Sequence, residues 1–367
     1  MIATTVVPKA GKNFRITPGE RIAVGVDTHK RTYAVSLWGI NEDTEIKHWT
    51  QPADPHALMR TLEPYREQIA QVAYEAGPTG FVLARALAGE RWPVLVASPA
   101  DIMSSRNAGK SDRLDARRLA RLCAKGLLDG CFIPSAAQDE ERRMVRIRGR
   151  ILADKVRIQL RIKSMLLCHG LSEPPGLKNW SQAGMKQLRE LPCSADLRFC
   201  LELLATQLEQ TKQLLRICDR QLSKLAQRSQ HKKDIEILTS IPGIGTPSAL
   251  QFLVEMGPVG RFESRLYASK YQGLSPEVRQ TGQTRCELDL NNSGNRRLRT
   301  LLVEATWRWI GYDTNARALY DHMIRNTGFA QKAIVAVARK LGILMWHLRE
   351  RQTSYDTTKL ATKPQRR

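Results

Sequence analysis

The chain has 367 residues, 42% of them hydrophobic and 26% charged, which is long enough for two or three globular domains. Lysine and arginine number 58 against 36 aspartates and glutamates, and this net charge of +22 favours a nucleic-acid partner. No long apolar run appears, which argues against a membrane span or a signal peptide. Seven cysteines without zinc-site spacing predict reduced thiols and a cytoplasmic protein.

Residues 21–130 alternate apolar runs with helical patterns. The expected strands lie within residues 21–39 (two strands), 44–50, 71–77 and 93–99, and the expected helices within 54–68, 79–90 and 112–126. A hairpin meander followed by alternating strands and helices predicts an α/β domain with a mixed sheet. An RNase H-like, or RuvC-like, domain has this order of elements.

Residues 131–232 are expected to be helical. Between residues 142 and 163 there are nine lysines or arginines and a single acid, Asp154, although apolar residues still recur at helical spacing. A second helix shows a heptad seam, formed by Leu201, Leu204, Leu208, Thr211, Leu215, Cys218, Leu222 and Leu225. This seam predicts a coiled coil or a two-helix hairpin, used either as a dimerising stalk or for packing on its own domain.

The last region, residues 233–351, is expected to be mainly helical, with helices near 296–311 and 329–350 and a Gly-rich polar stretch at 273–295. The segment "SIPGIGTPSA" predicts a helix-hairpin-helix element. There Gly243 and Gly245 would let the backbone approach a phosphate at the start of a helix. The alternative is a simple glycine-rich connection between helices. Residues 1–20 and 352–367 are polar, basic and aperiodic, and are expected to be tails.

Four carboxylates are candidates for one acidic site. Asp27 and Glu75 each follow a buried apolar run, whereas Asp112 and Asp115 lie three residues apart at a helix start, about 5–6 Å apart on one face. Each acid alone is compatible with an ordinary cap or ion pair. Together they can converge at one sheet edge, where oxygen ligands suit Mg²⁺ or Mn²⁺ and a metal pair would orient a phosphodiester.

The motifs "VGVDTHK", "YEAGPTGFVLARAL" and "KSDRLDARRLARL" resemble those of bacterial insertion-sequence transposases with a RuvC-like DEDD domain, relatives of the Piv-type DNA invertases. The resemblance continues through "LTSIPGIGTPSALQFLVEMG", "YQGLSPEVRQTG" and "NNSGNRRLRTLLVEATW". It implies that Asp27, Glu75, Asp112 and Asp115 are the family's acidic metal ligands. It also implies a DNA recombinase, guided in several members by a structured bridge RNA, whose two sites meet between subunits of a tetramer.

The family's serine nucleophile aligns with Thr281, which is followed by Gly282. A threonine hydroxyl can attack a phosphodiester, although its methyl group crowds the approach. Three hypotheses remain open: Thr281 is the nucleophile, a nearby hydroxyl of Ser275, Thr284 or Ser293 replaces it, or the chain binds DNA without recombining it. The corresponding alternatives for function are a RuvC-like nuclease or junction resolvase that uses water, and a non-catalytic nucleic-acid-binding derivative.

Basic residues near these sites are candidates for phosphate contacts. They are Lys110, Arg113, Arg117 and Arg118 around the acidic pair, and Arg296, Arg297 and Arg299 at a later helix start. A solvated charged face is the alternative for the second group. The expected partners are DNA, a guide RNA and further copies of the chain, as a dimer or tetramer joined through the coiled coil.

Overall fold

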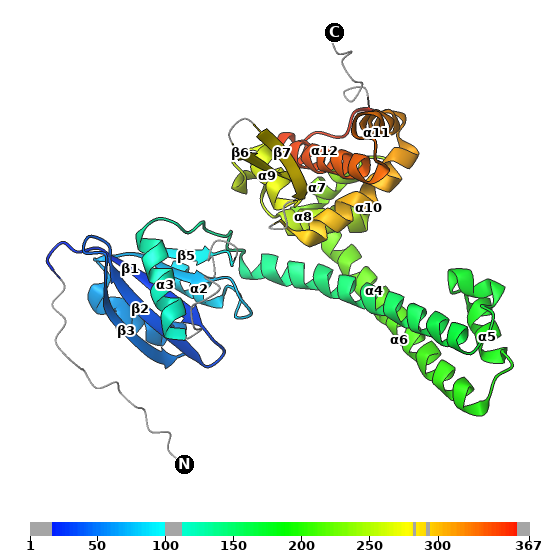
Figure 1. Ribbon diagram of the computed structural model, residues 1–367, viewed down its shortest axis with the longest axis horizontal. Coiled ribbons are helices and arrows are strands. Elements are labelled where there is room, and N and C mark those ends of the chain that lie inside the picture. The colour runs from blue at the N-terminus through cyan, green and yellow to red at the C-terminus, as the bar shows by residue number, and fades with distance from the viewer. Residues whose placement is uncertain (1–16, 100–111, 282–283, 291–293, 358–367) are drawn as a thin grey trace, which may run out of the picture. The chain divides into compact units, whose positions relative to one another are not determined.

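A computed structural model describes residues 17–99, 112–281, 284–290 and 294–357 (Figure 1). The side chains of residues 112–113 and 276–289 also lie outside the described part. The chain divides into two compact units, residues 1–135 and 136–367. The predicted helical region and C-terminal region therefore share the second unit. Within the described residues, no helix is both long and apolar enough to cross a membrane.

The first unit is built on a five-stranded mixed sheet with the order β3-β2-β1-β4-β5. Its strands are β1 (Ile22–Thr28), β2 (Thr32–Gly39), β3 (Thr44–Pro52), β4 (Ile69–Glu75) and β5 (Val94–Ala97). The central strand β1 is antiparallel to β2 and parallel to β4. The mixed α/β sheet predicted from the alternation of patterns is confirmed.

Helices cover both faces of this sheet. They are α1 (Pro55–Leu62), α2 (Val82–Gly89) and α3 (Asp112–Ala124). On one face, buried residues such as Val24 and Tyr74 pack with α1 and α2. On the opposite face, Ala73 and Ala97 pack with Leu119 of α3. Alternate residues of each strand point to opposite faces, so β1 supports both layers.

The second unit contains nine helices within the residues that the structure describes there. They are α4 (Ala136–Cys168), α5 (Gln182–Glu190), α6 (Ala195–Ala226), α7 (Ser229–Thr239), α8 (Thr246–Met256), α9 (Arg265–Tyr271), α10 (Arg296–Tyr312), α11 (Thr314–Thr327) and α12 (Ala330–Arg351). Helix α11 was not predicted from the sequence; it begins at the side-chain cap Asp313 and ends before Gly328, which has a φ of 72°.

Helices α4 and α6 form a long hairpin (Figure 1). Most of the predicted heptad seam on α6 is buried, including Leu201, Leu208 and Leu215. Leu201 and Leu208 pack in one cluster with Ile158, Ile162 and Leu166 of α4. The structure therefore shows the seam of α6 packing within its own chain, which is one of the two alternatives considered for it.

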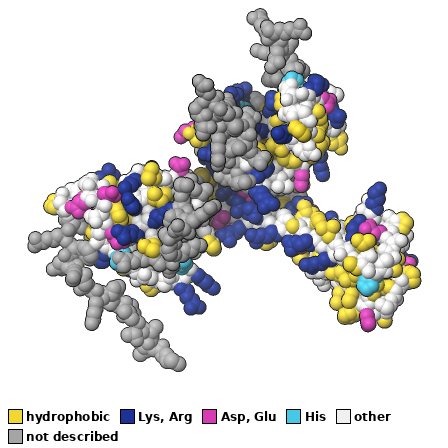
Figure 2. Space-filling model, in the orientation of Figure 1, with side chains coloured by type: hydrophobic (Ala, Val, Ile, Leu, Met, Phe, Trp, Pro, Cys, Tyr) yellow, Lys and Arg dark blue, Asp and Glu magenta, His cyan; other side chains and the backbone are white. Residues whose placement is uncertain are grey.

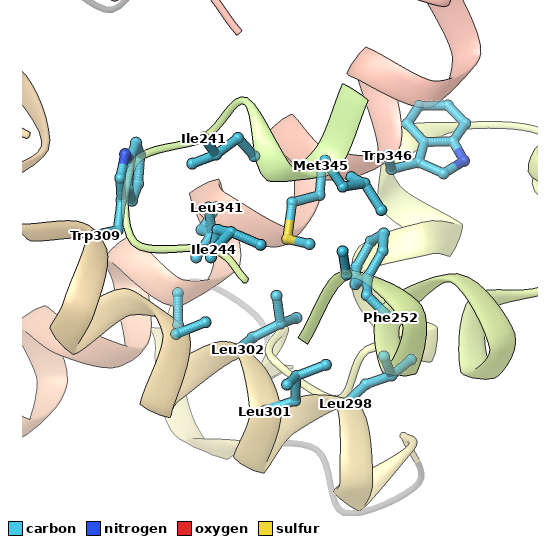
Figure 3. Close-up of a cluster of buried hydrophobic side chains, with 14 of the residues drawn as sticks. Ile241, Ile244, Phe252, Leu298, Leu301, Leu302, Trp309, Leu341, Met345 and Trp346 are labelled. Atoms are coloured by element: carbon cyan, nitrogen blue, oxygen red, sulfur yellow. The ribbon is translucent and has the colours of Figure 1, made fainter. Parts of the chain in front are cut away.

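Helix α5 packs against the hairpin, whereas α7 to α12 surround a core in which α8, α10 and α12 meet (Figure 3). Phe252, Leu302 and Met345 come from these three helices and are fully or almost fully buried. A two-stranded antiparallel sheet, β6 (Pro276–Thr281) and β7 (Thr284–Leu290), leaves this core. The sequence analysis treated residues 273–295 as a Gly-rich polar stretch and missed these strands.

A buried carboxylate joins the base of the hairpin to this core. Arg146 of α4 donates two hydrogen bonds of 2.8 Å to Glu255, which is fully buried. Asn295 donates a third bond of 3.0 Å to the same carboxylate. Burial alone would raise the pKa of Glu255, but these donors and the positive charge of Arg146 lower it. Glu255 therefore remains ionised and fixes α4 to the start of α10.

Candidate active site

Two of the four predicted carboxylates lie on neighbouring parallel strands. The register pairs Val26 of β1 with Tyr74 of β4, so the next residues, Asp27 and Glu75, stand beside each other at the carboxyl edge of the sheet. Paired residues of adjacent strands point to the same face. That face also carries Gly25, two residues before Asp27, and it is the face that α3 covers.

The third carboxylate reaches this edge because α3 lies directly on β1. A Cβ atom at Gly25 would overlap the carbonyl oxygen of Ala116 and the backbone nitrogen of Ala120. Only glycine allows the helix to approach the strand this closely. Asp115 precedes the contact residue Ala116, so the same packing brings its side chain toward the edge of the sheet.

The charges of Asp27 and Asp115 act on the carboxyl group of Glu75. The pKa of the Glu75 carboxyl is raised above its usual value, mainly because the protein removes part of its water. The negative charges of Asp27 and Asp115 raise this pKa further. Like charges in such a cluster repel, and a divalent cation would relieve that repulsion.

The fourth carboxylate, Asp112, is the first residue of α3, and its side chain lies outside the described residues. Among the side chains that are described, no group of three or more His, Cys, Asp or Glu residues is arranged to hold a metal ion. The donor set nevertheless fits a hard cation, because carboxylate oxygens on two strand ends and one helix are ligands of the type that Mg²⁺ and Mn²⁺ prefer.

One neighbour of the acids was not singled out in the sequence. His29 Nε2 lies 3.1 Å from Asp27 Oδ2, and both side chains are partly accessible. The strand end is also tied to the loop before α2, since the hydroxyls of Thr28 and Thr79 are 3.0 Å apart. The sequence did contain a signal for this neighbour. His29 follows Asp27 by two residues, and β1 ends at Thr28 between them.

The basic residues of α3 partly serve the fold. Arg117 lies 3.6 Å from the carboxylate of Glu45 and stacks near the ring of Trp38. Arg118 is half-buried. Lys110 and the side chain of Arg113 lie outside the described residues. The structure therefore gives one of the four predicted phosphate contacts a partner within the chain and leaves the role of the others as a prediction.

Thr281 is the last residue of β6 and pairs with Thr284 at the start of β7. Its side chain lies outside the described part, but the base of its hairpin is firmly held. A Cβ atom at Gly294 would overlap Gly273, where φ is 71°. Arg299 donates a 2.7 Å hydrogen bond to the Gly273 carbonyl. The two ends of the segment that carries Thr281 are therefore pinned together.

One alternative hydroxyl is described in detail. Ser275 Oγ lies 3.1 Å from Ser269 Oγ, and Ser269 is fully buried and accepts a hydrogen bond from Arg339. This network restrains the Ser275 hydroxyl at the base of the hairpin, whereas Thr281 lies at the far end of the strand. The side chains of Thr284 and Ser293 are outside the described residues.

The two glycines of "PGIG" have different surroundings. Gly243 has a φ of 82°, and a Cβ atom there would come within 3.1 Å of Arg308 and Tyr312 of α10. The close backbone approach that Gly243 permits is therefore an approach to α10 of the same protein. Gly245 is the N-cap of α8, and a Cβ there would meet only Pro247 within 4 Å. Of the two, Gly245 marks the more open helix start.

The arginines at the start of α10 also differ. Arg296 and Arg297 are exposed, whereas Arg299 holds the carbonyl of Gly273. Asn295 caps this helix by accepting hydrogen bonds from the backbone nitrogens of Arg297 and Leu298. The predicted basic cluster therefore consists of two exposed cations and one positioning residue.

Comparisons with known proteins agree with this arrangement. Residues 24–169 match the transposase model DEDD_Tnp_IS110, and residues 235–321 match the model of the transposase IS116/IS110/IS902 family. The putative transposase y4rJ of Sinorhizobium fredii is 29% identical over 94% of this chain and 96% of its own length. The transposase for insertion sequence element IS1111A of Coxiella burnetii is 24% identical over 74% of this chain and 75% of its own length.

The protein is thus of the insertion-sequence transposase class, with a DEDD-type region that covers the first unit and α4 and a second transposase domain after the hairpin. The chain belongs to the IS116/IS110/IS902 transposase family.

We expect Gly25→Ala to separate α3 from β1, because the added methyl group meets backbone atoms. The cost should be about 1–3 kcal/mol, as for other overpacked sites. Hydrogen exchange measured by mass spectrometry should speed up in β1 and α3. Gly89→Ala is the matched control, since a Cβ there meets nothing within 4 Å. Unchanged exchange in Gly25→Ala would contradict the close packing.

Proposed function

We propose that this protein cuts and rejoins DNA strands, using a metal-dependent acidic site and a hydroxyl nucleophile. The observation that carries the proposal is the convergence of Asp27, Glu75 and Asp115 at one edge of the sheet, expressed in the raised pKa of Glu75. A buried structural role explains such a cluster poorly, because neighbouring carboxylates repel one another unless a cation or proton is shared.

In this proposal the carboxylates of Asp27, Glu75, Asp112 and Asp115 hold Mg²⁺ or Mn²⁺. When bound, the ions would supply positive charge to the attacking oxygen and to the sugar oxygen that leaves. The protein's own contribution is positional. The pairing of β1 with β4 fixes two acids, and the contact of α3 with Gly25 fixes the others.

We further propose that the Thr281 hydroxyl attacks the phosphorus atom. The new bond joins phosphorus to the threonine oxygen, which gives up its proton. The bond to one sugar oxygen breaks, and that released oxygen takes up a proton. The covalent link preserves the phosphodiester energy, so a second sugar hydroxyl can reverse the step on another strand. The pinned base of the β6–β7 hairpin supports this role, because it limits where the strand end can move.

Nucleic-acid contacts are proposed at exposed cations and open helix starts. Arg296 and Arg297 are exposed at the start of α10, and Gly245 leaves the start of α8 open. A structured guide RNA is the proposed second partner, with DNA as the first. The basic helix α4 offers fewer contacts than its charge suggests, since Arg142, Arg146 and Arg148 bind groups of their own chain.

Replacing Asp115 by Asn should lower cutting of a supercoiled plasmid that carries the element's ends and target by about 100-fold or more, the usual scale for losing a charged group that stabilises a transition state. Chelating divalent ions should stop cutting by the wild type, and Mg²⁺ or Mn²⁺ should restore it. Asp129→Asn is the control, because Asp129 is an exposed acid elsewhere in the first unit. Wild-type activity in Asp115→Asn would contradict the acidic site.

The nucleophile is tested by two substitutions at Thr281. We expect Thr281→Ala to abolish a covalent protein–DNA complex, detected as a denaturation-resistant band with labelled DNA. Thr281→Ser should keep or increase that complex, because the hydroxyl remains and the crowding methyl group is removed. Full cutting by Thr281→Ala without a covalent complex would instead establish the nuclease that uses water. Wild-type protein that binds DNA but never cuts it would support the non-catalytic alternative.

Assembly through the α4–α6 hairpin is also proposed, but through a face other than the predicted seam. The outer face of α4 repeats at heptad spacing through Gly149, Ala153, Val156, Leu160, Lys163 and Leu167. Val156 and Leu160 are 45% and 59% exposed, and Leu214 and Ile217 of α6 are exposed as well. Hydrophobic side chains are visible along the hairpin in Figure 2. Two such hairpins would cover these side chains by forming a four-helix contact.

Leu160→Glu should shift the protein toward the monomer in sedimentation velocity, by placing a charge in the proposed contact. Ser223→Glu adds the same charge to an exposed position of α6, on the side of that helix away from Leu214 and Ile217, and should leave the association unchanged. If both variants associate like the wild type, the outer face of the hairpin is not the contact.

A further inference from the structure

A long groove lies between α9 and α12 in the second unit, beside the hairpin that carries Thr281. It has a volume of about 1110 Å³. Its lining positions on α12 run from Gln331 to His347, which at 1.5 Å per residue spans about 24 Å. Leu274 and Leu290, at the two ends of the β6–β7 hairpin, also line it. The groove is therefore continuous with the base of the proposed nucleophile segment.

The charge of the groove is of one sign. The described residues that line it include four permanent cations and no carboxylate: Arg265, Lys332, Arg339 and Lys340. Along α12 the cations are separated by about two turns, or roughly 10–12 Å. A ligand that fits this lining carries repeated negative charges along its length.

The floor between these cations is aliphatic. Val335, Ala336, Ile343 and Leu344 face the groove from successive turns of α12. These side chains are only partly buried, so the floor is accessible to a ligand. A ligand with charges on its outside and apolar faces toward the floor would satisfy both features of the groove.

One cation is held in position by the network beneath the hairpin. Arg339 Nε donates a 3.0 Å hydrogen bond to the buried Ser269, whose hydroxyl is 3.1 Å from that of Ser275. Ser275 directly precedes β6, so this network joins the guanidinium in the groove to the start of the strand that ends at Thr281.

We propose that the groove binds an unpaired DNA strand and leads it to the β6–β7 hairpin. This inference rests on the proposed function. Phosphates would contact the cations, and bases and deoxyribose carbons would contact the aliphatic floor. DNA fits better than RNA because the floor offers no partner to a ribose 2′-hydroxyl, and burying that group without a hydrogen bond is costly.

The chain's own tails do not suit this groove. Residues 1–16 contain three lysines or arginines and residues 358–367 contain four, and neither segment contains an acid. Both would be repelled by the cations of the lining. An acidic amphipathic helix of another protein shares the required charge, so it is the competing occupant that the experiment has to separate from DNA.

The test measures binding of a fluorescent 12-nucleotide single strand by anisotropy, in the Asp115→Asn background so that cutting does not interfere. Lys332→Gln with Lys340→Gln should weaken DNA binding about 10-fold. The slope of log affinity against log salt should fall by about 1.4, since each lost phosphate contact contributes about 0.7. Ala336→Glu, which puts an acid in the floor, should also weaken binding. Lys232→Gln with Lys233→Gln removes the same charge from exposed positions of α7 and should change affinity little.

Equal affinities in the groove variants and the α7 control would overturn the proposal, and cutting by the wild type would show that the proposed function survives. A loss confined to RNA of the same sequence would overturn the assignment to DNA. If the groove variants lose binding only to an acidic amphipathic peptide, the occupant is a protein helix. If the wild type binds no nucleic acid at all, both the groove and the proposed function fail.

Discussion

The candidate site depends on the direct contact between α3 and β1 at Gly25. Strand pairing alone places Asp27 beside Glu75, because β1 and β4 are adjacent and in register. The helix has no such register to guide it. Its position is set by backbone packing, in which Gly25 removes the side chain that would hold Ala116 and Ala120 away. One missing Cβ atom therefore determines how near Asp115 comes to the strand-end acids. The pKa of Glu75 is raised mainly by loss of water, then by the charge of Asp27, and the charge of Asp115 adds to these effects.

The large positive charge of the chain is only partly available to a ligand. Arg142 and Arg349 are almost fully buried, and both bind backbone carbonyls. Arg349 also binds Asp234. Arg146 neutralises the buried Glu255. These cations stabilise the fold, since removing one would leave buried acceptors without a partner. The net charge thus agrees with the DNA binding expected of a transposase, but it overstates how many cations are accessible to such a ligand. Accessible side chains such as Arg296 and Lys340 are better guides to where a ligand would bind.

The sequence predicted the first unit well because most of its strands are short, largely apolar segments bounded by turns or charged residues. The same reasoning failed for residues 273–295, where Val278, Gln280, Thr284 and Cys286 mix polar and apolar types and the glycines suggested a loop. The available signal was a Gly-Gln pair between two alternating segments, which favours a two-residue hairpin turn. Convergence of Asp27, Glu75 and Asp115 was expected from their placement, whereas the Gly25 contact and the neighbour His29 required the tertiary structure.

A heptad pattern reports that a helix face is covered, but it does not identify the covering helix. On α6 the seam through Leu201 and Leu208 packs with α4 of the same chain. Periodicity alone could not separate this from a dimer, because knobs pack into holes in both cases. The exposed side chains of Leu160 and Leu214 therefore need an explanation other than packing within the hairpin. A hairpin that needed only to fold would gain nothing from a second apolar face, and exposed aliphatic stripes on a highly charged helix favour association. The partner of α6 is thus found within the chain, and the argument for an oligomer rests on the outer face instead.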